Sequence, residues 1–361
     1  MKKNPDYVFL ILVSLLLIIG TLMVFSSSPA LGLKMGDSFY YLKRHLFYII
    51  LGLFGFFFAL NLKLANLRKW AFPLLILSVL LLLALYIPGV GKTLGGATRW
   101  LDLYIISFQP SELAKFAVVL FFAQVLANKK DNIRNFVTGL FPLPLVIGAV
   151  AGIIIKQPDM GTALSLLGAV FIMFFAAGAN LWHLGSLLLV GAFGILIISI
   201  TSPYRMRRLL GYLDPWADPL NVGFHIIQSL LAVGSGGLMG LGLGNSRQKF
   251  FYLPQQYADF IFAVYCEELG FIGAAVLILL FVGFFWRGIK IAFEAHDDFS
   301  YLFAIGLIGL FAVQTFLNLS VVLGLVPTTG IPLPFISYGG TAMVINLFSI
   351  GLLANISRGA K

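Results

Sequence analysis

One carboxylate, Asp259, stands where a polar segment ends and a long apolar stretch begins, within YLPQQYADFIFAVYCEELGFIG at 252–273. A charged aspartate at the centre of a bilayer costs about 2.5–3.5 kcal/mol on insertion scales, so an acid kept at the mouth of a membrane helix is a functional-site hypothesis. A carboxylate in such a place can accept a proton from an attacking hydroxyl. The alternative is an Asp at a helix N-terminus, stabilised by the helix dipole. The local sequence leaves both interpretations open.

A second group of charged residues lies within GKTLGGATRWLDLYIISFQPSELAKF at 91–116. Arg99 follows a turn-rich lead-in, beside a tryptophan suited to the membrane interface. The residues before Glu112 have the composition of a helix start, and Lys115 lies at i+3 from Glu112, so the two can pair on one helix face. The pair either fixes this helix against its neighbours or holds a cation ready for an anionic substrate.

Two further segments contribute candidates. In KQPDMGTAL, Asp159 precedes a Gly-Thr helix start, which is the usual position of a cap. The 57 residues at 202–258, which include Arg205, Arg207 and Arg208, are too many for a simple connector. Their glycine-rich middle predicts a segment that lies on the membrane surface and folds over a cavity. It matches neither glycine-rich nucleotide motif, which argues against a dinucleotide or ATP site.

The loop LVPTTGIPLPFISYGGTAM at 325–343 is dense in Pro and Gly. Irregular backbone at membrane depth is tolerated only where protein covers it or where it lines an aqueous cavity. The loop is therefore predicted to form either the wall of a binding site, with Ser337 as a candidate substrate-binding residue, or a stiff loop packed on the bundle.

Other polar residues lie deep in apolar stretches. Glu267 and Glu268 must face the bundle interior, a cavity or a basic partner. Gln314 and Asn318 lie at i,i+4 and predict a polar face with interhelical hydrogen bonds.

The elements that must position these residues are membrane helices. The 361-residue chain is 60% hydrophobic and 11% charged, whereas soluble proteins have about 25% charged residues. A spanning helix needs about 20 mainly apolar residues. We predict an all-α polytopic membrane protein, a single domain over 1–361 with a large extracytoplasmic loop at 202–258 between helices seven and eight. About ten transmembrane helices are expected, near 8–26, 45–62, 71–88, 112–128, 136–155, 162–179, 182–201, 259–285, 301–324 and 341–357.

An even number of helices places both termini on one side. The predicted inner segments hold twelve Lys and Arg residues and the short outer loops six, which predicts cytoplasmic termini by the positive-inside rule. This bias and the basic outer residues explain the net charge of +10 without a nucleic-acid partner. The single cysteine, Cys266, excludes an intrachain disulfide and a thiolate metal cluster.

Several motifs together resemble the SEDS family (shape, elongation, division and sporulation), in order and from end to end. They are GGATRW, FQPSELAKF, QPDMGTA, the run from DPWADPLNVGF to CEELG, and PTTGIPLPFISYGG. GLGNSRQK is more similar to the FtsW and SpoVE branch than to RodA. The chain departs from the family at Tyr257-Ala258, where many members have His-Thr.

The resemblance implies a ten-helix enzyme of the bacterial inner membrane that polymerises lipid II into glycan strands. Its implied partners are a class B penicillin-binding protein, the transpeptidase, and other divisome or elongasome membrane proteins. By motif match, Asp259 occupies the family's essential acid position, and Arg99, Glu112, Lys115 and Asp159 match other family-typical positions. The family has also been proposed to flip lipid II.

The predicted reaction is an inverting glycosyl transfer at the outer face. Asp259 takes the proton of the attacking hydroxyl, and cations stabilise the departing undecaprenyl diphosphate. The candidate donors are Arg99, Lys115, Arg205, Arg207 and Arg208. No cofactor is predicted with certainty: a divalent cation, Mg or Mn, is compatible with Asp259 or Asp159, although the sequence shows no complete ligand set. A lipid II flippase and a non-catalytic scaffold are the alternatives, and the lack of an apparent inverted repeat counts against the flippase.

Overall fold

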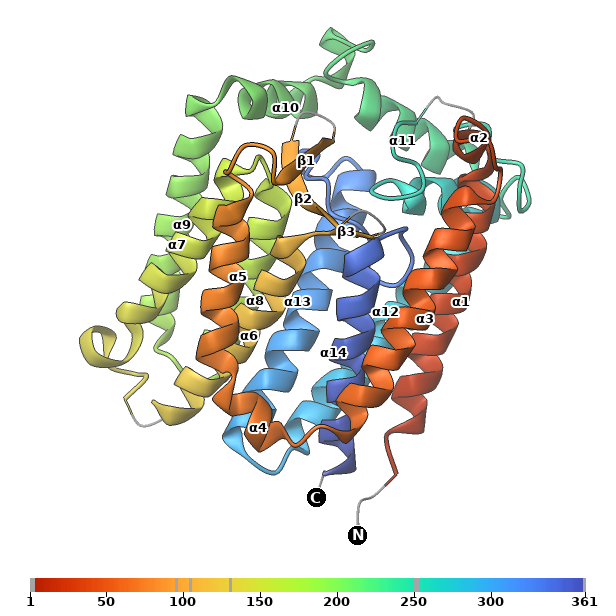
Figure 1. The fold of residues 1–361 in the computed structure, drawn as a ribbon. Coiled ribbons are helices and arrows are strands. Elements are labelled where there is room, and N and C mark those ends of the chain that lie inside the picture. The colour runs from red at the N-terminus through yellow and green to blue at the C-terminus, as the bar shows by residue number, and fades with distance from the viewer. Residues whose placement is uncertain (1–3, 95–96, 104–105, 130–131, 250–252, 360–361) are drawn as a thin grey trace.

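The computed structural model describes residues 4–94, 97–103, 106–129, 132–249 and 253–359. A bundle of long helices dominates it (Figure 1), and each of the ten predicted stretches corresponds to a helix. Seven of these helices are long and apolar enough to cross a membrane, whereas α5, α7 and α8 are shorter and lie beside them in the bundle. The polytopic helical fold is confirmed, and ten as the number of crossings stays a prediction. The helices are α1 (Tyr7–Ser27), α3 (Tyr40–Asn61), α5 (Ala71–Ala84), α6 (Pro110–Asn128), α7 (Pro142–Lys156), α8 (Met160–Ala176), α9 (Leu181–Thr201), α12 (Ile261–Phe293), α13 (Asp298–Val322) and α14 (Gly340–Arg358).

Shorter elements close the two ends of the bundle. One end carries α10 (Pro203–Leu213) and α11 (Phe224–Ser235), which belong to the segment at 202–258, together with the strands and α2 (Pro29–Leu33). The opposite end carries α4 (Leu64–Lys69), the start of α1 and the end of α14, so the two chain ends share one side (Figure 1). A π-helical turn (Phe136–Leu140) precedes α7, and a 3-10 turn (Pro215–Ala217) follows α10.

The sequence prediction missed a small antiparallel sheet. Its strands are β1 (Gly91–Leu94), β2 (Ala97–Leu103) and β3 (Ile106–Phe108), in the order β1-β2-β3. Lys92 pairs with Trp100, and Leu101 pairs with Phe108. The segment expected to be a turn-rich lead-in is thus part of an antiparallel sheet, although Gly95 and Gly96 lie outside the described residues. The sheet matters because β2 carries Arg99.

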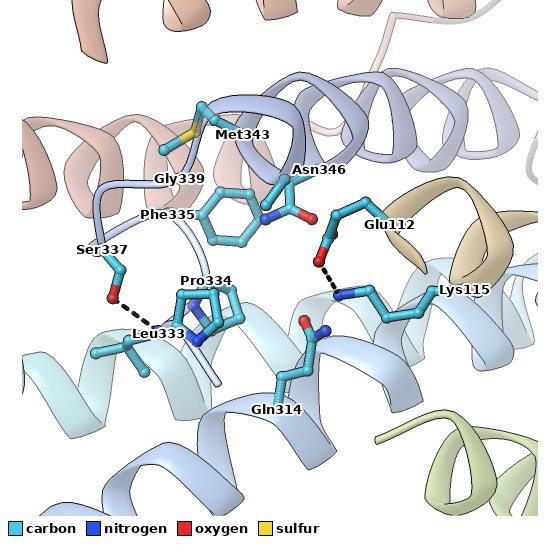
Figure 2. Close-up of a pocket in the computed structure, with 12 residues that line it drawn as sticks. Glu112, Lys115, Gln314, Leu333, Pro334, Phe335, Ser337, Gly339, Met343 and Asn346 are labelled. Carbon is cyan, nitrogen blue, oxygen red and sulfur yellow. Dashed lines mark hydrogen bonds and ion pairs between the residues drawn. The ribbon is translucent and has the colours of Figure 1, made fainter. Parts of the chain in front are cut away.

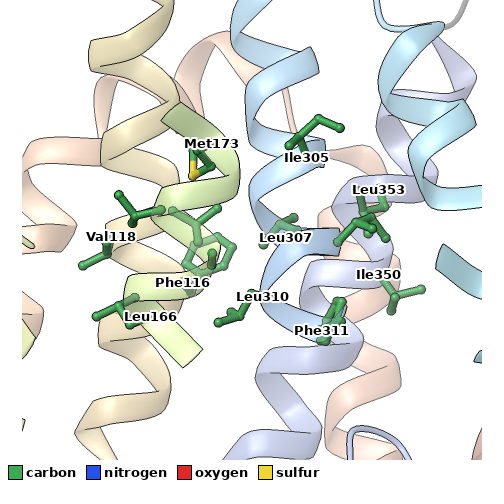
Figure 3. Packing of buried hydrophobic residues seen from close by; sticks show 14 of the residues in the cluster. Phe116, Val118, Leu166, Met173, Ile305, Leu307, Leu310, Phe311, Ile350 and Leu353 are labelled. Atoms are coloured by element: carbon green, nitrogen blue, oxygen red, sulfur yellow. The ribbon is translucent and has the colours of Figure 1, made fainter. Parts of the chain in front are cut away.

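The core lies around α13 and α6, each 72% buried over its most apolar window. Apolar side chains of α6, α8, α13 and α14 interdigitate there, among them Phe116, Leu166, Leu307 and Ile350 (Figure 3). By contrast, α9 is 6% buried and presents its apolar residues to the surroundings. Small residues allow close approach, since a Cβ on Gly351 of α14 would lie 2.5 Å from the Phe56 carbonyl oxygen of α3.

The stretch predicted as one helix at 259–285 is broken. Gly270 has φ 64 and ψ −165, which divides α12 into two helical parts. The turn that follows α11 fills the break: Leu241 N donates to the Glu267 carbonyl at 3.0 Å, and Phe271 N donates to the Gly237 carbonyl at 2.9 Å. The glycine-rich segment therefore packs into α12, because its backbone satisfies the groups that the break releases.

Candidate active site

Asp259 lies in a run of turns immediately before α12. Its backbone carbonyl accepts a hydrogen bond from Asn318 Nδ2 at 2.7 Å, and the same nitrogen donates to the Ile331 carbonyl at 2.8 Å. Asn318 is 1% exposed, so α13 fixes this turn and the Pro/Gly-rich loop together. The expected interhelical role of Asn318 is wrong, because its partners are loop carbonyls rather than another helix.

The Asp259 carboxylate is half-buried and accepts no hydrogen bond from the described residues. The N-cap of α12 is Phe260, without a side-chain cap, so Asp259 does not cap the helix. Burial raises the pKa of Asp259 to about 6; Arg99 and Arg208 act to lower it, and Asp159 acts to raise it. These four charged side chains form one electrostatic cluster, which is the candidate active site.

Arg99 is held by backbone carbonyls at the end of α7. Its Nε donates to Gln157 O at 3.1 Å, and its Nη2 donates to Pro158 O. Its Nη1 lies 4.0 Å from Asp159 Oδ1. The sheet therefore brings Arg99 across to the α7–α8 turn.

Asp159 caps α8, as its position before the Gly-Thr helix start predicted. Its carboxylate accepts from Thr162 N at 3.2 Å and from Thr162 Oγ1 at 2.9 Å. The side chain is also part of the electrostatic surroundings of Asp259. Asp159 thus caps α8, and its own negative charge lies opposite Arg99.

The three arginines of α10 differ in their placement. Arg208 Nη1 donates to the Thr328 carbonyl at 2.8 Å, its guanidinium lies 4.5 Å from the Tyr204 ring centroid, and burial lowers its pKa. Arg205 Nη2 donates to the Ile155 carbonyl at 2.7 Å and ties α10 to α7. Arg207 is exposed and makes no hydrogen bond or ion pair with the described residues. Of the three, Arg208 is the one in the Asp259 cluster.

The predicted pair of Glu112 and Lys115 is confirmed, with Oε1 and Nζ 2.8 Å apart and both side chains buried. Figure 2 shows the pair facing Gln314 of α13 and Pro334 of the loop. The cavity between them has a volume of about 10 Å³, roughly the space that one water needs. Asp259 is not part of its lining. The role of Lys115 toward a substrate stays a prediction.

Ser337 holds the loop against the turn that carries Asp259. It is 3% exposed; its Oγ donates to the Ala258 carbonyl at 2.6 Å and accepts from Leu333 N at 2.8 Å (Figure 2). The neighbouring Tyr338 N donates to the Tyr257 carbonyl at 3.0 Å. These bonds explain how the loop positions Asp259, whereas substrate binding by Ser337 stays a prediction.

Sequence reasoning missed a cluster of tyrosines beside the turn. The ring centroids of Tyr41 and Tyr257 lie 4.6 Å apart, and Tyr338 lies 5.4 Å and 5.6 Å from them. Burial raises the pKa of both Tyr257 and Tyr338. The three rings come from distant segments, so the departure at Tyr257 was the only sequence signal of the cluster.

The candidate active site offers few protein ligands for a metal ion. No group of three or more His, Cys, Asp or Glu side chains that could hold an ion occurs in the ranges the structure covers. Asp259 and Asp159 would supply two carboxylates, so a bridging divalent cation would need diphosphate oxygens to complete its shell.

The chain is similar to known proteins over nearly its whole length. A family model, FTSW_RODA_SPOVE, described as "Cell cycle protein", matches residues 6–361. "Stage V sporulation protein E" of Bacillus subtilis (strain 168) is 44% identical over 99% of this chain and 98% of its own. "Probable peptidoglycan glycosyltransferase FtsW" of Geobacter sp. (strain M18) is 42% identical over 98% of this chain and 97% of its own.

Two solved structures share the fold. One is a chain described under "Structural coordination of polymerization and crosslinking by a peptidoglycan synthase complex", with a TM-score of 0.81, 31% identity and coverage of 98% of both chains. The other is the rod shape determining protein RodA of Thermus thermophilus, with a TM-score of 0.73, 29% identity and coverage of 98% of this chain and 97% of that one. The chain therefore belongs to the FtsW, RodA and SpoVE family of cell cycle proteins.

Proposed function

We propose that this protein is a peptidoglycan glycosyltransferase that polymerises lipid II, with Asp259 as its general base. The observation that carries the proposal is the Asp259 carboxylate itself, which is half-buried, has a pKa raised to about 6 and lies among Arg99 and Arg208. A pKa near the working pH suits a general base, and cations beside it suit a phosphorylated substrate. The FtsW relative's name supports the same activity.

In the proposed step, the 4-hydroxyl oxygen of the acceptor GlcNAc attacks the anomeric carbon of the MurNAc at the end of the growing strand. The Asp259 carboxylate takes the hydroxyl proton as the new carbon–oxygen bond forms. The bond from the anomeric carbon to the diphosphate oxygen breaks, and its electron pair leaves with undecaprenyl diphosphate. Attack from the face opposite the leaving group inverts the anomeric centre, and proton transfer of this kind contributes about 10²–10⁴-fold.

The two arginines act on the leaving group. Arg99 uses two of its five N–H donors on the Gln157 and Pro158 carbonyls, and Arg208 uses one on Thr328. The backbone bonds fix both guanidiniums, so their remaining N–H donors would need little reorganisation to bind a diphosphate. Lys115, Arg205 and Arg207 are secondary candidates.

The bundle end that carries Asp259 is proposed to face outward. It lies opposite the end where α1 begins and α14 ends, and the Lys and Arg bias of the predicted loops supports cytoplasmic termini. The partner is proposed to be a class B penicillin-binding protein, which agrees with the likeness to a chain of a peptidoglycan synthase complex.

The test is polymerisation of labelled lipid II by the purified protein, with its partner transpeptidase present. Asp259→Asn is compared with Asp102→Asn, which removes an exposed acid paired with Lys92 at 3.0 Å. Glycan strands from the parent and from Asp102→Asn, with none from Asp259→Asn, are expected. Normal strands from Asp259→Asn would remove Asp259 from the mechanism. Lipid II movement across vesicles without any polymer would support the flippase instead.

A further inference from the structure

A second pocket lies at the end of the bundle opposite Asp259. Residues of α4, α6 and the start of α13 line it. Its volume of about 450 Å³ is within the size range of ligand sites. Along α13, the distance from Asp297 beside this pocket to Asn318 beside Asp259 is about 30 Å at ~1.5 Å per residue. The pocket is therefore separate from the candidate active site.

The polar lining of the pocket carries two cations, Arg68 and Lys69, and one acid, Asp297, beside the neutral Gln124 and Ser300. The Arg68 guanidinium lies 5.3 Å from the Phe299 ring centroid and donates to Asn128 Oδ1, which leaves further N–H donors. Lys69 is exposed and makes no hydrogen bond or ion pair with the residues described. The pocket lining thus contains two cations with hydrogen-bond donors left for an anionic group.

The acid in the lining is already engaged. Asp297 Oδ1 accepts from Ser300 Oγ at 2.6 Å and its Oδ2 accepts from Ser300 N at 3.4 Å, so the carboxylate caps α13. Both carboxylate oxygens of Asp297 therefore accept hydrogen bonds from the first turn of α13. The lining therefore presents two cations against one capped acid, which favours an anion.

One wall of the pocket is apolar. Leu64, Ala65 and Phe299 form it. Trp70, 61% exposed, and Phe72, 57% exposed, follow directly at the start of α5, and aromatic residues in such positions mark the level of lipid headgroups. A free phosphate would gain no favourable contact from this apolar surface. A glycerolipid would, because its glycerol and acyl chains can pack against it.

We propose that this pocket binds an anionic phospholipid, with its phosphate on Arg68 and Lys69 and its glycerol and upper acyl chains against Leu64, Phe299 and Trp70. Basic pockets between membrane helices bind such headgroups, and the flat guanidinium, stacked on Phe299, matches a phosphate with two parallel N–H groups. The proposal does not depend on the proposed enzymatic activity.

The test is native mass spectrometry of the full-length protein in neutral detergent, titrated with phosphatidylglycerol or with phosphatidylcholine of the same chains. Phosphatidylglycerol is expected to bind more tightly. Lys69→Gln should weaken that binding about fivefold, the change that corresponds to about 1 kcal/mol per basic residue, and Arg68→Gln/Lys69→Gln should weaken it more. Lys63→Gln, an exposed lysine at the N-cap of α4 outside the pocket lining, is the matched control and should change nothing.

Three results would overturn the proposal. The first is equal binding of the two lipids, and the second is a phosphatidylglycerol preference that survives the double variant. The third is displacement of the lipid by millimolar inorganic phosphate, which would indicate a simple anion site. Because Lys69 is exposed and its side chain makes no hydrogen bond or ion pair with the described residues, we expect Lys69→Gln to keep the fold and to remain informative if the Arg68 variant unfolds.

Discussion

Asp259 and the pair Glu267 and Glu268 lie on the same chain segment, but their carboxylates have opposite surroundings. Glu267 accepts from Ser246 Oγ and from two backbone N–H groups of residues 247 and 248 at 2.9 and 3.4 Å. Glu268 accepts from Ser26 Oγ at 2.7 Å and pairs with Lys249 Nζ at 3.3 Å. The Asp259 carboxylate accepts no hydrogen bond from the described residues. Carboxylates whose hydrogen bonds are complete hold structure, whereas an unsatisfied one is available for proton transfer.

The two glutamates fasten the segment at 202–258 to the break in α12. Their partners at 246–249 follow the glycine turn that pairs with the chain around Gly270. From there the chain continues to Gln256, which donates to the Lys249 and Ser27 carbonyls, and then to Asp259. The region around the two glutamates therefore stabilises the chain that positions Asp259, the proposed general base. The predictions below separate the two roles.

Asp259→Asn should give the largest change in activity and little change in stability. The neutral side chain cannot accept the proton, so the polymerisation rate should fall by about 10²–10⁴-fold. No hydrogen bond to the described residues is lost, and the desolvated charge disappears. Polymerisation of lipid II and thermal unfolding in detergent measure both effects. A large loss of stability would show that Asp259 is structural.

Glu268→Ala should do the reverse and act mainly on stability. It removes the acid opposite Lys249 and a partner of Ser26 in a buried site, which costs about 3–5 kcal/mol when one member of a buried pair is lost. The midpoint of thermal unfolding should drop clearly, while the pH profile of the remaining activity keeps its shape. An altered pH profile would indicate that Glu268 takes part in the reaction, and it would contradict the distinction drawn between Glu268 and Asp259.

Gly270→Ala should destabilise the break in α12 itself. The residue has φ 64, and an added Cβ would lie 2.4 Å from Gly240 N and 2.6 Å from Leu238 O. Strain of this kind costs about 1–3 kcal/mol. Gly283→Ala in the same helix is the control, because its nearest neighbour would be Leu12 Cδ2 at 3.5 Å. Equal thermal stability of the two variants would mean that the break is not needed for folding.

The pH dependence should report Asp259 directly. Since its pKa is raised from 3.8 to about 6, the active carboxylate form is lost below pH 6, and the rate should fall about tenfold per unit there. The sign for stability is opposite: folding favours the protonated acid, so its contribution to stability is complete below pH 3.8 and is lost as the pH rises through 6. Rates measured from pH 5 to 8 test this, and a flat profile would contradict it.

The sequence predicted what depends on local pattern and missed what depends on distant contacts. Apolar runs located every long helix, and i,i+3 spacing located the pair of Glu112 and Lys115. The break at Gly270 was missed because an uninterrupted apolar run predicts one continuous helix. The turn that inserts at the break comes from about thirty residues earlier in the chain, so no local pattern indicates it. Likewise, the neighbours of Asp259 come from β2, the α7–α8 turn and α10, and no local spacing relates those segments.

The arginines of α10 show the same limit and give the smallest predicted effects. Sequence alone treats Arg207 and Arg208 as equal, whereas the structure places Arg208 on the Thr328 carbonyl near Asp259 and leaves Arg207 exposed. Arg208→Gln should slow polymerisation about tenfold, about 1.4 kcal/mol of transition-state stabilisation, because one fixed charge near the leaving diphosphate is lost. Arg207→Gln should stay within about twofold, since exposed charges contribute little. Steady-state rates with lipid II rank the two variants, and a larger effect at Arg207 would mean that the substrate approaches along the exposed side of α10 rather than through the Asp259 cluster.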